Sequence, residues 1–193
     1  AYSDGLGRAV QTVRLRQSPE GFDIVQPKEY DAYGRESKLY LPYVSGTDGR
    51  LKSIIPALYN FYQDQANVAH DPAPYAERRY EASPLNRVLE QGSEGTVWQI
   101  GSGNTSAFEY KLNHLQDVVF NWDVDATTDA LTLAGYYAPN ELLKNVTKDA
   151  HRHAVIEFVD KLDRVVLKRV QAVTTPNSVY ITGQWADTYY VYD

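Results

Sequence analysis

Residues 30–35 read Tyr-Asp-Ala-Tyr-Gly-Arg, and the same order of residue types recurs three more times along the 193-residue chain. In each copy an aromatic residue leads into an acidic or hydroxyl residue. Three positions later comes a residue type that tolerates positive φ, and an arginine follows it directly. The other copies are Tyr2-Ser3-Asp4-Gly5-Leu6-Gly7-Arg8, Tyr80-Glu81-Ala82-Ser83-Pro84-Leu85-Asn86-Arg87 and Phe158-Val159-Asp160-Lys161-Leu162-Asp163-Arg164, and a fifth begins at Tyr192-Asp193.

The fixed spacing predicts a β-hairpin turn at each copy. A type I turn favours Asp or Ser at its first position, and a three-residue hairpin loop closes through a residue with positive φ. The first position is taken by Asp4, Asp31, Ser83 and Asp160. The left-handed position, which suits glycine, asparagine and aspartate, is taken by Gly7, Gly34, Asn86 and Asp163.

The arginine that follows each left-handed position opens the outgoing strand. Its planar fork can hydrogen-bond to the turn carboxylate or to carbonyl groups of a neighbouring hairpin. We interpret Arg8, Arg35, Arg87 and Arg164 as structural residues, because one small domain has no need of four catalytic copies.

Composition limits the classes of protein to which the chain can belong. Charged residues make up 23% and hydrophobic residues 43%, and 16 tyrosines favour strands over helices. A net charge of −6 with no basic stripe argues against a nucleic-acid partner. No run approaches the ~18 apolar residues that a membrane span needs. The lack of cysteine excludes disulfides and a cysteine nucleophile, and the lack of methionine indicates a fragment of a longer protein.

The pattern along the chain predicts a mainly β fold of stacked antiparallel hairpins with a small β-sandwich or meander. Residues 1–44 and 141–193 are expected to form repeat hairpins. Residues 45–80 form an insertion with one short helix near 56–66, where Pro56 suits the first turn. Residues 81–140 are expected to combine a repeat hairpin with the sandwich or meander. Short strands are predicted at 96–100, 107–112, 117–124, 130–137, 179–182 and 188–192.

Few residues suggest catalysis or metal binding. His151 and His153 are two apart but have no third ligand nearby in sequence, and no serine lies in a nucleophile elbow. We therefore assign no catalytic residue, metal or cofactor. The three tryptophans offer either a sugar-stacking platform or core residues, and we favour the core; they are Trp98, Trp122 and Trp185.

The four turn motifs and the closing Tyr-Val-Tyr-Asp resemble the tyrosine-aspartate (YD) repeats of bacterial Rhs proteins. Four further stretches resemble an uncharacterised domain that precedes the main repeat array in some of these proteins. They are Asp-Ile-Val-Gln-Pro at 23–27, Tyr-Leu-Pro-Tyr at 40–43, Glu-Ala-Ser-Pro-Leu-Asn-Arg-Val at 81–88 and Val-Val-Leu-Lys-Arg at 165–169. The third motif departs from the family pattern, since Ser83 replaces Asp and Asn86 replaces Gly.

The resemblance implies a large bacterial protein that is secreted or held at the cell envelope. Its repeats would wind into a hollow β-shell around a variable C-terminal toxin or effector. This chain would be a non-enzymatic part of that wall, and its partners would be the remaining repeats and the toxin domain. The alternative from the residues themselves is a carbohydrate-binding β-sandwich module, at 75–150, for a cell-surface glycan.

Overall fold

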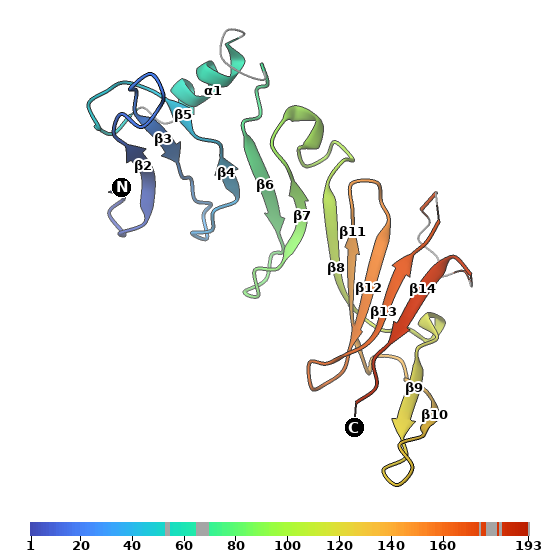
Figure 1. Cartoon of the computed structure of the whole chain (residues 1–193). Helices are drawn as coiled ribbons and strands as arrows, with labels where there is room; N and C mark the ends of the chain where they lie inside the picture. Colours follow the sequence, from blue (N-terminus) through green and yellow to red (C-terminus); the bar gives the residue numbers. More distant parts are fainter. Residues whose placement is uncertain (53–54, 65–69, 174, 177–180, 182, 193) are drawn as a thin grey trace. The chain divides into compact units, whose positions relative to one another are not determined.

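The computed structural model describes residues 1–52, 55–64, 70–173, 175–176, 181 and 183–192 (Figure 1). The chain divides into two compact units, residues 1–105 and residues 106–193. Antiparallel strands make up most of the regular structure in both units, as the sequence predicts. Among the described residues, no helix combines the length and the apolar character that spanning a membrane requires.

Unit 1 contains two groups of antiparallel strands. The first has the order β1-β2-β3-β5, with β1 at Tyr2–Ser3, β2 at Ala9–Arg14, β3 at Ile24–Pro27 and β5 at Tyr43–Val44. The second has the order β7-β6-β4, with β4 at Lys38–Tyr40, β6 at Tyr75–Tyr80 and β7 at Val88–Gly92. The strands β1 and β2 flank the turn at 4–8 and pair with each other, and β6 and β7 do the same around the turn at 81–87. The turn at 31–35 lies between β3 and β4, which belong to different groups.

The predicted helix is α1, Ile55–Gln63. Residues 65–66 of the prediction lie outside the described residues. Leu58 is fully buried against Val25, Tyr40 and Tyr43, and the ring of Phe61 lies 6.3 Å from that of Tyr43. The helix therefore buries one apolar face on the core of unit 1.

The strand expected at 96–100 is instead a single turn of 3₁₀-helix, η1, at Thr96–Trp98. The carboxylate of Asp71 causes this difference. It accepts the Thr96 N–H at 2.9 Å and the Thr96 hydroxyl at 2.8 Å. A side-chain acceptor that lies 25 positions away in sequence thus satisfies the first backbone donor of the turn.

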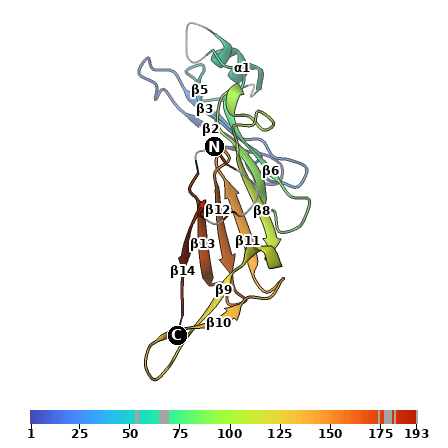
Figure 2. The same ribbon diagram turned by 90° about the vertical axis from the view of Figure 1, so that its right-hand side faces the viewer.

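Unit 2 is built on five antiparallel strands in the order β14-β13-β12-β11-β8, and Figure 2 shows the meander of its last four strands. The bounds are β8 Ser106–Leu112, β11 Leu143–Lys148, β12 Ala154–Val159, β13 Val165–Gln171 and β14 Trp185–Tyr189. The last strand begins three residues before the predicted 188–192, and the strand predicted at 179–182 lies almost wholly outside the described residues.

A separate two-stranded hairpin in unit 2 pairs β9, Phe120–Val124, with β10, Leu131–Tyr136. The prediction began the first of these strands at residue 117. The structure places the short 3₁₀ turn η2, Leu115–Asp117, there, and Val118 follows it with φ 49°. Aromatic and aliphatic residues face one another across the hairpin, including Trp122 opposite Leu133 and Phe120 opposite Tyr136.

The core of unit 2 lies along β12 and β13, where Phe158 and Leu167 are fully buried. A buried cation lies beside them. Arg169 is 1% exposed and donates two hydrogen bonds to Asp187, at 2.8 and 2.9 Å, and a third to the Asp117 carbonyl oxygen at 2.9 Å. This pairing offsets the cost of burying its charge.

Candidate functional site

The turn at residues 31–35 shows the geometry that the spacing predicts. The Asp31 N–H donates to the Arg35 carbonyl oxygen, and the Gly34 N–H donates to the Asp31 carbonyl oxygen, both at 2.9 Å. Gly34 has φ 77°. The turns at 4–8 and 160–164 have the same two bonds, with lengths between 2.9 and 3.1 Å and positive φ at the corresponding positions. All three are three-residue hairpin loops closed through a left-handed residue.

Each turn carboxylate is held by three hydrogen bonds. The Oδ1 atom of Asp31 accepts the N–H groups of Tyr33 and Arg35 at 2.9 Å, and its Oδ2 atom accepts the Arg35 Nε–H at 2.8 Å. The backbone N–H of Arg35, together with its guanidinium, lowers the pKa of Asp31 despite the opposing effect of desolvation. The Asp4 and Asp160 carboxylates accept the equivalent three bonds.

The third turn departs from this pattern. Ser83 keeps its place at the start of the turn, where its Oγ accepts the Leu85 N–H at 3.2 Å. The hairpin closes two residues earlier, because the Glu81 N–H donates to the Arg87 carbonyl oxygen. Glu81 also supplies the carboxylate that Ser83 lacks, and its Oε2 atom lies 2.7 Å from Arg87 Nη2. The Arg87 side chain lowers the pKa of Glu81 to about 2, and the Ser83 hydroxyl adds to the effect.

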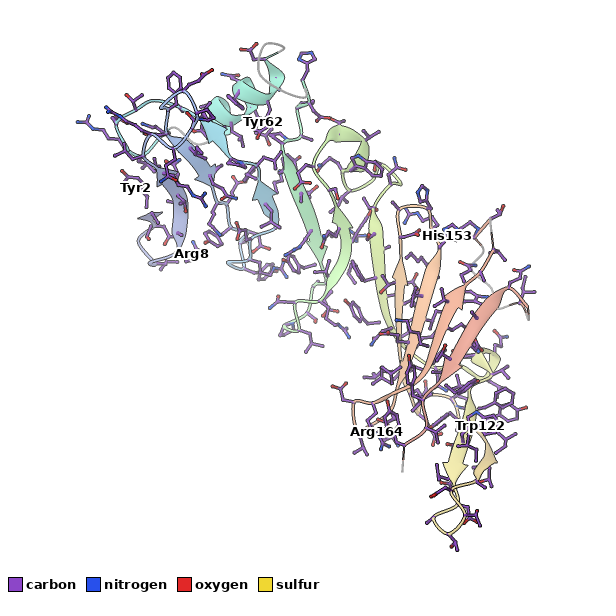
Figure 3. All side chains as sticks on the ribbon, viewed as in Figure 1. Tyr2, Arg8, Tyr62, Trp122, His153 and Arg164 are labelled. Atoms are coloured by element: carbon purple, nitrogen blue, oxygen red, sulfur yellow. The ribbon has the colours of Figure 1, made fainter. Side chains whose placement is uncertain are left out.

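Three of the four turn arginines also contact the aromatic residue that starts the next copy of the motif. The guanidinium carbon of Arg8 lies 4.6 Å from the centre of the Tyr30 ring. The matching distances are 4.6 Å from Arg35 to Tyr80 and 4.7 Å from Arg164 to Tyr192. These three Arg–Tyr pairs link consecutive copies through cation–π contacts. Figure 3 shows Arg8 and Arg164 at their turns.

Further contacts strengthen these pairs. The Tyr30 hydroxyl donates to the Ala9 carbonyl oxygen at 2.9 Å, and the Tyr192 hydroxyl donates to the Val165 carbonyl oxygen at the same distance. Both acceptors directly follow the arginine of the pair. In addition, Arg35 Nη1 donates to Asn86 Oδ1 at 3.0 Å, so this arginine reaches the left-handed position of the next turn.

The structure contains a further turn of this type at residues 149–153, which lacks the arginine of the motif. The Asp149 N–H donates to the His153 carbonyl oxygen, and the Arg152 N–H donates to the Asp149 carbonyl oxygen. His153 takes the arginine position, with its Nδ1 atom 3.7 Å from Asp149 Oδ2. Arg152 takes the left-handed position with φ 70°. The sequence predicted a hairpin there but not a copy of the turn motif. Arg152 is not a typical residue for the left-handed position, and His153 stands where the motif has its arginine.

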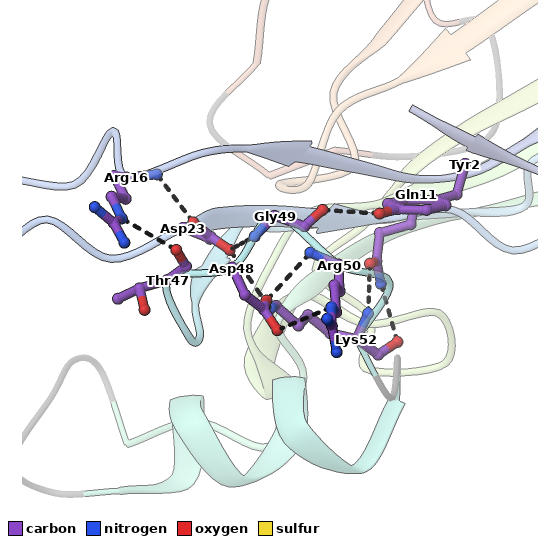
Figure 4. A network of polar contacts seen from close by, with 9 residues as sticks. All are labelled: Tyr2, Gln11, Arg16, Asp23, Thr47, Asp48, Gly49, Arg50 and Lys52. Carbon is purple, nitrogen blue, oxygen red and sulfur yellow. Dashed lines mark hydrogen bonds and ion pairs between the residues drawn. The ribbon is translucent and has the colours of Figure 1, made fainter.

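A second polar cluster anchors the loop at 45–52 of unit 1 (Figure 4). The fully buried carboxylate of Asp23 accepts the N–H groups of Arg16 at 2.9 Å and Gly49 at 2.7 Å. Lys52 Nζ lies 3.4 Å from Asp23 and also pairs with Asp48. Desolvation opposes the ionised form of Asp23, yet these donors hold its pKa below the usual value. The lysine ammonium occupies the place between the carboxylates that a metal ion would need.

The three tryptophans lie in different surroundings within their own units. Trp98 belongs to η1 in unit 1 and is 41% exposed. Trp185, on β14 in unit 2, packs against the core around Phe158. Trp122, on β9, lines a cavity of about 200 Å³ in unit 2. Across the described part of the chain, no three histidine or acidic side chains gather in a way that would hold a metal ion.

A family model described as "Domain of unknown function (DUF6443)" matches residues 1–112. The chain belongs to this family. The DUF6443 match covers all of unit 1 and the turns at 4–8, 31–35 and 81–87, whereas the turn at 160–164 lies beyond it. The predicted resemblance to an uncharacterised domain is thus confirmed at the level of DUF6443. No curated protein matches the chain, and no solved structure matches it.

Proposed function

We propose that this DUF6443 chain is a non-enzymatic structural segment of a large Rhs-type, YD-repeat protein. The segment would form part of a β-shell that encloses or presents a C-terminal toxin or effector. The protein would act outside the cytoplasmic membrane, in the cell envelope or the extracellular space. The main partners of the segment would be the other tyrosine-aspartate repeats of the same chain.

The observation that carries this proposal is the set of Arg–Tyr pairs. In each pair, a turn arginine contacts the tyrosine that begins the next motif, over 22 to 45 positions of sequence. A contact that recurs from one copy to the next can be extended by adding copies, as in other repeat architectures. A wall of variable length can be built in this way.

The engagement of the arginines supports a structural role over a catalytic one. All four form ion pairs with the carboxylate of their own turn, at 2.8, 2.8, 2.7 and 2.9 Å in chain order. An arginine that binds a substrate or a transition state needs donors directed into an open site. Here the donors are directed into the turn that precedes each outgoing strand.

Limited proteolysis of the natural full-length protein tests the proposal. The variant combines Arg35→Ala with Tyr80→Leu, and the control is Arg50→Ala, whose side chain is 84% exposed. We expect the C-terminal region to resist protease in the wild type and the control. Weakening the wall by about 1.4 kcal/mol would raise the cleavage rate of the double variant about tenfold. Equally fast cleavage of that region in all three proteins would show that it is not enclosed.

A further inference from the structure

The hairpin of β9 and β10 is a two-stranded sheet, and the described residues place no third strand in it (Figure 1). A two-stranded hairpin is only marginally stable by itself, and a third strand or a covering layer normally completes it. Strand β10 forms one edge of this sheet. It contains no charged residue and no proline, although lysine and proline commonly protect an exposed edge. This edge is therefore open to pairing with another strand.

Three residues of β10 direct their backbone N–H and C=O groups away from β9. The Asp125 N–H donates to the Ala130 carbonyl oxygen, and the Tyr137 N–H donates to the Val119 carbonyl oxygen, both at 3.0 Å. Hydrogen-bonded and non-hydrogen-bonded pairs alternate along an antiparallel ladder. With the observed register, which one bulge interrupts, the outward positions are Leu131, Leu133 and Tyr136. Within the described part of the chain, no backbone group pairs with these three positions.

The same three residues expose apolar side chains on one face of the hairpin. Their exposed fractions are 61%, 51% and 62% in chain order. Directly paired residues share a face, and the partners of these three on β9 are Val124, Trp122 and Phe120. The ring of Tyr189, on β14, packs against the last two, with centroids 6.3 Å from Trp122 and 6.0 Å from Phe120. A strand added beside β10 would extend this apolar face.

The other face and the loop of the hairpin are acidic. Asp123 lies on the other face, opposite Thr132, and the loop between the strands carries Asp125 and Asp129. Residues 118–140 include no lysine or arginine. None of the three carboxylates forms an ion pair with another described residue. The hairpin therefore carries three negative charges, which favour a cationic partner.

We propose that the open edge of β10 binds an extended strand of another protein, in which apolar residues alternate with lysine or arginine. Successive side chains of a strand point to opposite faces. The apolar residues of the added strand lie beside Leu131, Leu133 and Tyr136, and its basic residues lie on the face of Asp123. Backbone hydrogen bonds supply the affinity in this mode of recognition, and the alternating side chains supply the specificity.

A second copy of this chain fits the edge less well than a basic strand. It would bring three further carboxylates, and like charges oppose association. The site does not depend on the shell proposal, because it needs only unit 2 and none of the Arg–Tyr pairs.

Fluorescence anisotropy with three labelled octapeptides tests the site on this chain and on the natural full-length protein. The probes repeat Lys-Val, Glu-Val or Lys-Ser, so each of the last two differs from the first only in charge or only in apolar character. We expect the Lys-Val peptide to bind saturably, with a dissociation constant below about 1 mM. The other two peptides should bind at least about tenfold more weakly.

Two variants locate the binding on the hairpin. Leu133→Pro removes an outward N–H group and an exposed apolar side chain, and it should weaken binding of the Lys-Val peptide at least about tenfold. The matched control is Leu115→Ala, which changes a 70% exposed leucine outside the hairpin and should bind as the wild type does. The second variant combines Asp123→Asn, Asp125→Asn and Asp129→Asn. It keeps the side-chain acceptors of the loop and should weaken binding at least about threefold.

The proposal is overturned if the Lys-Val peptide does not bind, if the Glu-Val peptide binds as tightly, or if either variant binds as well as the wild type. Sedimentation of the free chain gives a further test. Self-association that Leu133→Pro abolishes would assign the edge to a second copy and contradict the proposal. Binding by this chain but not by the full-length protein would show that another segment of the same protein covers the edge, which also contradicts it.

Discussion

Individual residues determine the turns through two local requirements. One is an acceptor side chain at the first position, and the other is a backbone that tolerates positive φ three positions later. Both requirements involve neighbours in sequence, so the sequence was sufficient to predict them at Asp4, Asp31 and Asp160. It was not sufficient at Ser83, because Glu81 supplies the carboxylate that Ser83 lacks, which keeps the ion pair with Arg87 and moves the closure of the hairpin to Glu81.

The left-handed position gives a residue-scale prediction. Gly34→Ala should destabilise unit 1 by about 1–2 kcal/mol, because its φ of 77° is unfavourable for a residue with a Cβ. The new Cβ would also lie 3.3 Å from Arg8 Nη1. Urea unfolding measures the effect. The matched control is Gly5→Ala, which has open space around its Cβ position and should change stability by less than about 0.5 kcal/mol. Equal effects for the two variants would contradict this account.

At the scale of elements, the sequence predicts the helices and strands that follow from a local residue pattern. It does not predict the turns and contacts that need a partner far away in sequence. The helix predicted near 56–66 and the meander strands followed from periodicity and turn chemistry. The 3₁₀ turn at Thr96 did not, because its acceptor is Asp71. The Arg–Tyr pairs were also missed, although their residues were all named, because the sequence does not show which tyrosine lies under which arginine.

Helix α1 gives an element-scale prediction. Leu58→Ala should cost about 2–5 kcal/mol, because the side chain is fully buried among Val25, Tyr40 and Tyr43 and its removal leaves a cavity. Thermal unfolding monitored by circular dichroism measures the loss. Leu6→Ala serves as the control, since Leu6 is 78% exposed in a turn. A loss below about 1 kcal/mol at Leu58 would mean that the helix does not contribute to the core.

At the scale of the whole molecule, paired carboxylates recur in both units, so acid should weaken the fold of each. The Arg87 side chain lowers the pKa of Glu81 from 4.5 to about 2, and Lys111 and Lys148 lower that of Glu109 to about 2. At a pH between about 2 and the ordinary pKa of 4.5, these two carboxyl groups are protonated in the unfolded chain but stay ionised in the folded chain. Stability is therefore fully present above about pH 5 and falls as the pH approaches 2.

The acid dependence can be measured as a change in thermal stability. The thermal unfolding midpoint should be similar at about pH 7 and about pH 5 and clearly lower at about pH 3. Glu81→Gln should lower the midpoint at neutral pH and reduce the additional drop at low pH, because the variant has lost one of the groups that titrate. A midpoint that stays constant or rises on acidification would show that the carboxylate pairs do not stabilise the fold.

The central claim is that the Arg–Tyr pairs join successive motifs, and a double-mutant cycle on Arg35 and Tyr80 tests it most directly. The variants are Arg35→Ala, Tyr80→Leu and their combination, with stability measured by urea unfolding. A coupling energy of about 1 kcal/mol is expected, because the guanidinium carbon lies 4.6 Å from the ring centre and the Arg35 side chain is only 20% exposed. The parallel cycle with Tyr80→Phe keeps the ring and should give a coupling energy near zero. Additivity within about 0.3 kcal/mol in the Tyr80→Leu cycle would contradict the claim.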